Sequence, residues 1–143
     1  MSKMICCEAV RGKGAVALLV LRLVAGYAFI LHGWPKIQHA TTWMGDALPG
    51  WLQFLAAFAE FAGGAAILVG LLTPLAASGI AVTMLVAMFM VHIPAGHPFV
   101  GNKENPSSWE LPAVYLSIMA VLMLRGGGSF SLDALIFGKK EGK

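Results

Sequence analysis

The chain has 143 residues, of which 58% are hydrophobic and only 12% are charged. This composition is too apolar for a soluble fold of that length. Ten basic and seven acidic residues give a formal net charge of +3 but form no basic stripe, so nucleic acid is excluded as an expected partner. The lipid bilayer is the expected solvent, and the 17 glycines suit close contact between membrane helices.

Four apolar runs follow one another along the chain and are predicted to cross the bilayer as helices. Leu48-Pro49-Gly50 is a turn signal before the second run, and Thr73-Pro74 ends it because proline cannot continue the preceding hydrogen-bond ladder. Pro94-Ala95-Gly96 ends the third run, and Gly126-Gly127-Gly128 ends the fourth. The predicted spans are residues 15–34, 51–72, 74–93 and 109–124.

Basic residues are concentrated near the two termini. The two long loops hold only Lys36 and Lys103. The positive-inside rule therefore places both termini in the cytoplasm, which agrees with an even number of crossings. The terminal basic residues are Lys3, Arg11, Lys13, Arg125, Lys139, Lys140 and Lys143.

The expected fold class is an all-α membrane protein with a four-helix transmembrane bundle over residues 15–125. Residues 1–14 and 126–143 are expected to be cytoplasmic segments. Residues 131–137 are apolar on one side and predict a short C-terminal interfacial helix. The expected location is the plasma (inner) membrane, crossed several times with both termini inside.

Two ionisable residues, Arg22 and Glu60, lie well inside the predicted spans. A lone charge there costs at least ~2.5 kcal/mol, so each needs a partner. Counted from the cytoplasmic ends, Arg22 lies ~10 Å deep and Glu60 ~18 Å deep, a gap that a guanidinium arm can bridge. We predict that they form an intramembrane polar pair, either as a structural lock or as part of a functional site.

Helical spacing predicts which faces of the first two helices point into the bundle. The first helix carries charged and small residues on one face. The second carries a polar face and a row of small residues suited to close helix contact. The three sets are Arg22, Gly26, Phe29, Gly33 and Lys36; Gln53, Glu60 and Gly64; and Ala62, Ala66 and Gly70.

A second candidate site combines four polar residues near the non-cytoplasmic ends of the helices. If they converge, they could bind a proton, a metal or the carbonyls of a quinone head group. The alternative is that they lie in the headgroup layer, where snorkelling and water satisfy them separately. These residues are His32, Lys36, His92 and Glu110.

Soft metal ligands are sparse. Met84, Met88 and His92 follow helical spacing and form a set that Cu(I) accepts, but methionine usually fills gaps in a core, so we expect no metal here. Cys6 and Cys7 are adjacent, with Cα atoms ~3.8 Å apart, which is below the usual disulfide span. Free thiols are expected, with palmitoylation or soft-metal binding as alternatives.

This pattern resembles the DoxX family of small four-helix membrane proteins over nearly the whole chain. The first helix and its exit, the second helix and the turn after it, the end of the third helix, the start of the fourth and the C-terminal segment all match. The matching residues are Arg22-Leu23 to Gly26, His32-Gly33 and Lys36; Glu60, Gly63-Gly64 and Gly70-Leu71-Leu72-Thr73-Pro74; His92; residues 110–115; and Gly126-Gly127-Gly128-Ser129-Phe130-Ser131-Leu132-Asp133.

The resemblance implies the four-helix fold more sharply than it implies a function. Family members are similar to the small subunit of a thiosulfate:quinone oxidoreductase, and others are implicated in membrane redox complexes that act against oxidative and thiol stress. Distant relatives include membrane chaperones for receptor assembly. Redox function is therefore carried over by analogy.

Three hypotheses follow. The first is a membrane subunit associated with redox or thiol-stress chemistry that binds a quinone, or a membrane or peripheral partner oxidoreductase, at the outer polar cluster. The second is a non-catalytic scaffold or assembly factor, because no self-sufficient catalytic motif is present. The third is a small-solute pathway marked by the intramembrane charges. At most the chain would be an oxidoreductase subunit dependent on a partner, and a homo-oligomer stays open.

Overall fold

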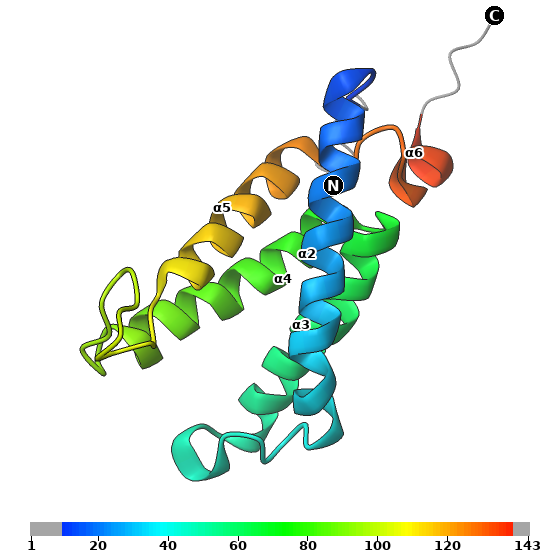
Figure 1. Ribbon diagram of the computed structural model, residues 1–143. Coiled ribbons are helices and arrows are strands. Elements are labelled where there is room, and N and C mark those ends of the chain that lie inside the picture. The colour runs from blue at the N-terminus through cyan, green and yellow to red at the C-terminus, as the bar shows by residue number, and fades with distance from the viewer. Residues whose placement is uncertain (1–9, 139–143) are drawn as a thin grey trace, which may run out of the picture.

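The computed structural model describes residues 10–138, which form helices joined by turns and contain no strand within that range (Figure 1). A 3₁₀ turn, Gly45–Ala47, precedes the second long helix, and a π-helical turn, Ala87–His92, extends the third. The all-α class is confirmed for this part of the chain. The α-helices are α2 (Lys13–Gln38), α3 (Gly50–Val69), α4 (Thr73–Val86), α5 (Glu110–Arg125) and α6 (Leu132–Phe137).

Three helical segments are long and apolar enough to cross a membrane. They are Lys13–Gln38, Gly50–Val69 and Thr73–His92, with mean hydropathies of 2.2, 1.8 and 2.0. α5 is shorter, with 16 residues. The exposed surface is also apolar, since Val24 and Leu75 keep exposed fractions of 64% and 68%. Such side chains suit lipid better than water, as expected of an integral membrane protein.

The helices form two antiparallel pairs. α2 packs along α3, α4 packs along α5, and the turn between α3 and α4 joins the pairs. In Figure 1 the two pairs diverge from the end of the molecule that carries the start of α2 and the red helix α6. The long loops after α2 and after α4 therefore lie at separate tips.

The close contact between α2 and α3 depends on glycine. A Cβ atom on Gly26 would lie 2.8 Å from the carbonyl oxygen of Gly64, and one on Gly33 would lie 2.5 Å from the backbone nitrogen of Phe61. Both distances are too short for a real side chain, so the backbones can approach only without one. Arg22, Gly26, Phe29 and Gly33 are all buried, which confirms the predicted inward face of the first helix.

Side chains from α2, α3, α4 and α5 share one apolar core. Phe29 is its largest apolar member, and the ring of Tyr115 on α5 packs against it with centroids 4.8 Å apart. The burial of these apolar side chains stabilises the contact between the α2–α3 pair and the α4–α5 pair near the turn that joins them. The buried members are Leu18, Ala25, Phe29, Ile67, Ala77, Ile80, Ala81, Met84, Met119 and Leu122.

Candidate functional site

Arg22 is almost fully buried, with 1% of its surface exposed. Its Nε donates to the carbonyl of Ile67 at 2.9 Å and its Nη2 to that of Leu68 at 3.1 Å, both at the end of α3. Its Nη1 donates to the carbonyls of Gly127 and Phe130 at 2.7 and 2.8 Å. Four of the five guanidinium N–H groups therefore bind backbone oxygens from two distant segments, and they tie the turn after α5 to α2 and α3.

Asp133 also joins the C-terminal segment to the helices, through the turn between α3 and α4. Its two carboxylate oxygens accept hydrogen bonds from the backbone nitrogens of Leu72 and Thr73 at 2.6 and 2.8 Å, and its own nitrogen donates to the carbonyl of Gly70 at 2.8 Å. Leu72 has a positive φ of 47°, a conformation that side chains disfavour and that these bonds hold in place. Asp133 also attracts the Arg22 guanidinium.

Two glycines allow the close packing in this region, one beside Arg22 and the other beside Thr73. A Cβ atom on Gly70, whose φ is 73°, would lie 2.5 Å from Nη2 of Arg22. One on Gly127 would lie 2.8 Å from Oγ1 of Thr73. We call Arg22, Gly70, Gly127 and Asp133 the latch, because together they fasten the C-terminal segment to the helices.

The predicted pairing of Arg22 with Glu60 is wrong, because Glu60 binds the ammonium of Lys36 instead. Side chains on a helix tilt toward its N-terminus. α2 and α3 run antiparallel, so Arg22 tilts toward the latch while Glu60 tilts toward the opposite end. Lys36, which tilts back along α2, meets it there.

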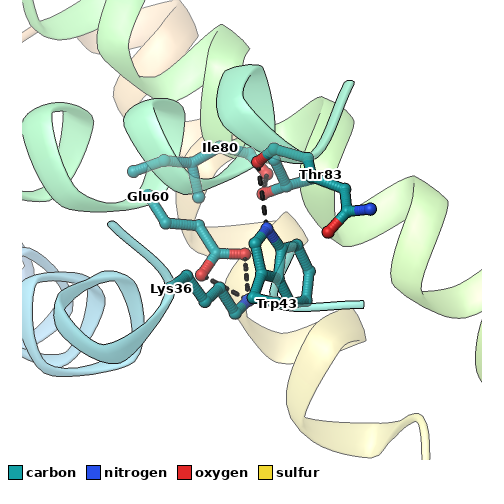
Figure 2. Close-up of polar contacts among 6 residues, drawn as sticks. Lys36, Trp43, Glu60, Ile80 and Thr83 are labelled. Carbon is teal, nitrogen blue, oxygen red and sulfur yellow. Dashed lines mark hydrogen bonds and ion pairs between the residues drawn. The ribbon is translucent and has the colours of Figure 1, made fainter. Parts of the chain in front are cut away.

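The Lys36–Glu60 ion pair lies between α2 and α3 (Figure 2). The Lys36 ammonium donates to both carboxylate oxygens, at 2.7 and 2.6 Å, and the Glu60 side chain is only 5% exposed. The same ammonium lies 4.6 Å from the centre of the Trp43 ring. A carboxylate this deeply buried needs its cation, and the ring adds a cation–π contact.

Gln53 organises the loop that covers this pair. It is 1% exposed, and its side-chain oxygen accepts from the nitrogen of Met44 at 2.8 Å while its amide nitrogen donates to the carbonyls of Gly45 and Leu48, each at 2.7 Å. Its own carbonyl accepts the indole N–H of Trp43 at 3.0 Å. The ring of Trp43 is thereby fixed in orientation, a role of Gln53 that helical spacing alone does not indicate.

An open hollow of about 490 Å³ lies beside the ion pair and is lined by Pro35, Lys36, His39, Thr42 and Trp43. We call it the Lys36 hollow. His39 and Thr42 are exposed, and α2 runs past Pro35 to Gln38, which keeps Lys36 on the helix. A cation, a hydroxyl, an imidazole and an aromatic face therefore line one hollow.

Within the described residues, 10–138, the four residues expected to form the outer polar cluster do not contact one another. His32 is exposed on α2 and faces the ring of Tyr115, with centroids 6.3 Å apart. Glu110 is exposed at the start of α5. The convergence of His32, Lys36, His92 and Glu110 is not seen because the two helix pairs diverge at this end.

His92 has another partner, His97, to which α-helical spacing does not point. Met84 belongs to the apolar core, and Met88 is likewise buried. The described part of the chain has no group of three or more histidine, cysteine, aspartate or glutamate residues placed to hold a metal ion. Cys6 and Cys7 lie outside the described residues.

A comparison with known proteins identifies two relatives. The chain is 30% identical over 132 residues to a Bacillus subtilis (strain 168) protein named "Putative oxidoreductase CatD", covering 89% of this chain and 92% of that protein. It is 32% identical over 127 residues to an uncharacterized protein of Haemophilus influenzae, covering 85% and 92%. No solved structure matches the chain.

The family comparison agrees with these relatives. The DoxX family model matches residues 17–93, more than half of the chain, and this segment contains Arg22, Lys36, Glu60 and Gly70. Together with the relatives, which match over most of their length, this match shows that the chain belongs to the DoxX family.

Proposed function

We propose that this DoxX-family protein is a membrane subunit associated with redox or thiol-stress chemistry, and that it binds a quinone head group in the Lys36 hollow. The observation that carries the proposal is the lining of the hollow, where hydrogen-bond donors stand beside the face of Trp43 and a buried ion pair. The name of the Bacillus subtilis relative supports the redox part.

The size and the lining of the hollow support the quinone proposal. Its volume of about 490 Å³ is within the range of small-molecule sites. A quinone has a flat ring that can stack on Trp43 and two carbonyl oxygens that need donors. The Lys36 ammonium donates two of its three N–H groups to Glu60, so the third remains for a ligand. His39 and Thr42 supply two more donors.

When bound, the quinone would carry electrons to or from a partner oxidoreductase. The residues of this chain would bind and orient its head group. Glu60 holds Lys36 in place, and Gln53 holds Trp43. We accordingly assign positioning roles to Glu60 and Gln53, and binding roles to Lys36, Trp43 and the exposed donors.

Removal of the two exposed donors should weaken quinone binding without disturbing the fold. The double variant His39→Ala/Thr42→Val is expected to bind a short-chain quinone about tenfold more weakly, since two hydrogen bonds are lost. The measurement is the quenching of tryptophan fluorescence during titration in detergent. Thr41→Val, at the neighbouring exposed position, is the control and should bind normally. Equal binding by the double variant, or no binding by the parent protein, would contradict the proposal.

We also propose that α5 is the fourth span and that both termini are cytoplasmic. α5 covers roughly 24 Å at the usual rise, which is short but close to a hydrocarbon core. The amide of Ser129 donates to the carbonyl of Val10 at 3.1 Å, so the first and last described segments lie side by side. An even number of crossings fits this arrangement.

Single cysteines introduced into the protein lacking Cys6 and Cys7 will test this orientation. A membrane-impermeant maleimide should label Asp46→Cys and Lys103→Cys in intact spheroplasts, and should label Ser129→Cys only after permeabilisation. All three positions are exposed in the structure. Labelling of Ser129→Cys in intact spheroplasts would contradict the proposed orientation.

A non-catalytic scaffold or assembly factor is the second candidate. The observation that favours it is the latch, where two charged residues act on the backbone of the fold and four of the five Arg22 N–H groups donate to backbone carbonyls. Extraction in mild detergent followed by mass spectrometry separates the candidates. A retained quinone supports the first, whereas a stable protein partner without quinone supports the second.

A further inference from the structure

The turn after α4 brings His92 and His97 into direct contact, away from the latch and from the Lys36 hollow. Their Nδ1 atoms lie 3.0 Å apart, and their ring centroids lie 5.2 Å apart with the planes at 61°. Both side chains are half-buried. Two imidazole nitrogens thus converge on one point at the tip of the α4–α5 pair.

The convergence is produced by an uncommon backbone. Residues 87–92 are π-helical, and the amides of Ile93 and His97 bond to the carbonyls of Met88 and His92, five residues back in each case. Residues five apart in an α-helix point roughly 140° away from each other, whereas bonds that close a five-residue turn stack them on one side. Gly96, with a φ of 71°, allows the chain to complete the turn.

The segment that follows His97 is fixed rather than loose. The amide of Trp109 donates to the carbonyl of Pro98 at 3.4 Å, and that of Glu110 donates to Phe99 at 3.0 Å. The rings of Phe99 and Trp109 pack with centroids 4.5 Å apart. His92 is held by the π-helical turn after α4 and His97 by this anchored segment, so the two rings are preorganised from both sides.

Two Nδ1 atoms that face each other at this distance need a proton or a metal ion between them, because two lone pairs would repel. One shared proton satisfies them, and so does a metal ion, because two nitrogens at about 2.0–2.1 Å from a tetrahedral zinc ion lie roughly 3.3 Å apart. The observed separation is only a few tenths of an ångström smaller than that. π-helical turns are also frequent at functional sites.

We propose that His92 and His97 form a two-imidazole site for a divalent transition-metal ion of the zinc class. Imidazole is a ligand that such ions favour, and water would complete the coordination, since the described residues offer no third histidine, cysteine, aspartate or glutamate beside the pair. The site is separate from the proposed quinone site and does not depend on it.

The test is a calorimetric titration of the full-length protein in detergent with Zn²⁺ alone at neutral pH. Cys6→Ser and Cys7→Ser are present throughout, so that the adjacent thiols cannot bind the metal. We expect one equivalent of zinc to bind, and His97→Ala to weaken its affinity at least about tenfold. His92→Ala should do the same, whereas His32→Ala, which removes an exposed histidine elsewhere, should not.

A loss of zinc binding could also result from misfolding of a variant. His97→Ala reduces this risk, because His97 lies in the connecting segment and its replacement leaves α4 intact. The thermal unfolding of each variant without metal is measured alongside. Equal zinc affinity in His97→Ala would overturn the proposal. So would the absence of zinc binding by the protein with all histidines present, and the pair would then share a proton only.

Discussion

Replacement of Arg22 with methionine should destabilise the folded protein by about 4 kcal/mol, since buried carbonyls that lose their donor cost ~1–3 kcal/mol each. Two of the four bonds, to Ile67 and Gly127, are fully buried, and the other two are partly buried. Methionine fills much of the volume but donates no hydrogen bond. In the variant, the C-terminal segment should therefore keep its bonds through Asp133 but lose those through Arg22.

The measurement is reversible unfolding in mixed detergent micelles, monitored by the circular dichroism signal of the helices. Arg22→Lys should fall between the parent and Arg22→Met, because an ammonium is a point charge that cannot reproduce the planar fork of the guanidinium. Arg125→Met is the matched control. Arg125 is exposed at the end of α5, so its loss should change stability by less than about 0.5 kcal/mol. Equal stability of Arg22→Met and Arg125→Met would refute the latch.

The helix faces could be predicted from the sequence because they depend on local periodicity. Gln53, Glu60 and Gly64 share a face by spacing alone, and all three are buried in the structure. The close approach at Gly26 and Gly64 follows from the same pattern. Periodicity fixes which side of a helix is buried, irrespective of which neighbour covers it.

The partners of the buried charges could not be predicted in this way. The depths predicted for Arg22 and Glu60 along the membrane normal are close enough for the two side chains to meet. Their side chains nevertheless point away from each other, because each tilts toward the N-terminus of its own helix and the two helices are antiparallel. Asp133 lies 61 residues from Leu72, whose amide it caps. Spacing within one helix carries no information on a contact between such distant segments.

The histidine pair was missed for a different reason. Residues 92 and 97 point in different directions under α-helical periodicity, and only the π-helical turn brings them together. Convergence of His32, Lys36, His92 and Glu110 would require the loop ends of all helices to meet. Instead the two helix pairs diverge there (Figure 1).

The second large effect is expected at the Lys36–Glu60 ion pair. Lys36→Met should cost about 3–5 kcal/mol, because it leaves a carboxylate that is 5% exposed without its cation. Glu60→Leu should cost less, since the Lys36 ammonium is 26% exposed and can reach water. The double variant should be more stable than the sum of the single losses predicts, with a coupling energy of about 2 kcal/mol.

A second double-mutant cycle distinguishes this arrangement from the pairing that depth along the membrane suggested. Arg22→Met and Glu60→Leu should be additive within about 0.5 kcal/mol, because the two side chains tilt toward opposite ends of the helix pair and share no partner. The same unfolding assay measures both cycles. A coupling between Arg22 and Glu60 as large as that between Lys36 and Glu60 would contradict the geometry. If instead only the Lys36 cycle shows coupling, the buried carboxylate depends on Lys36, as its proposed role beside the hollow requires.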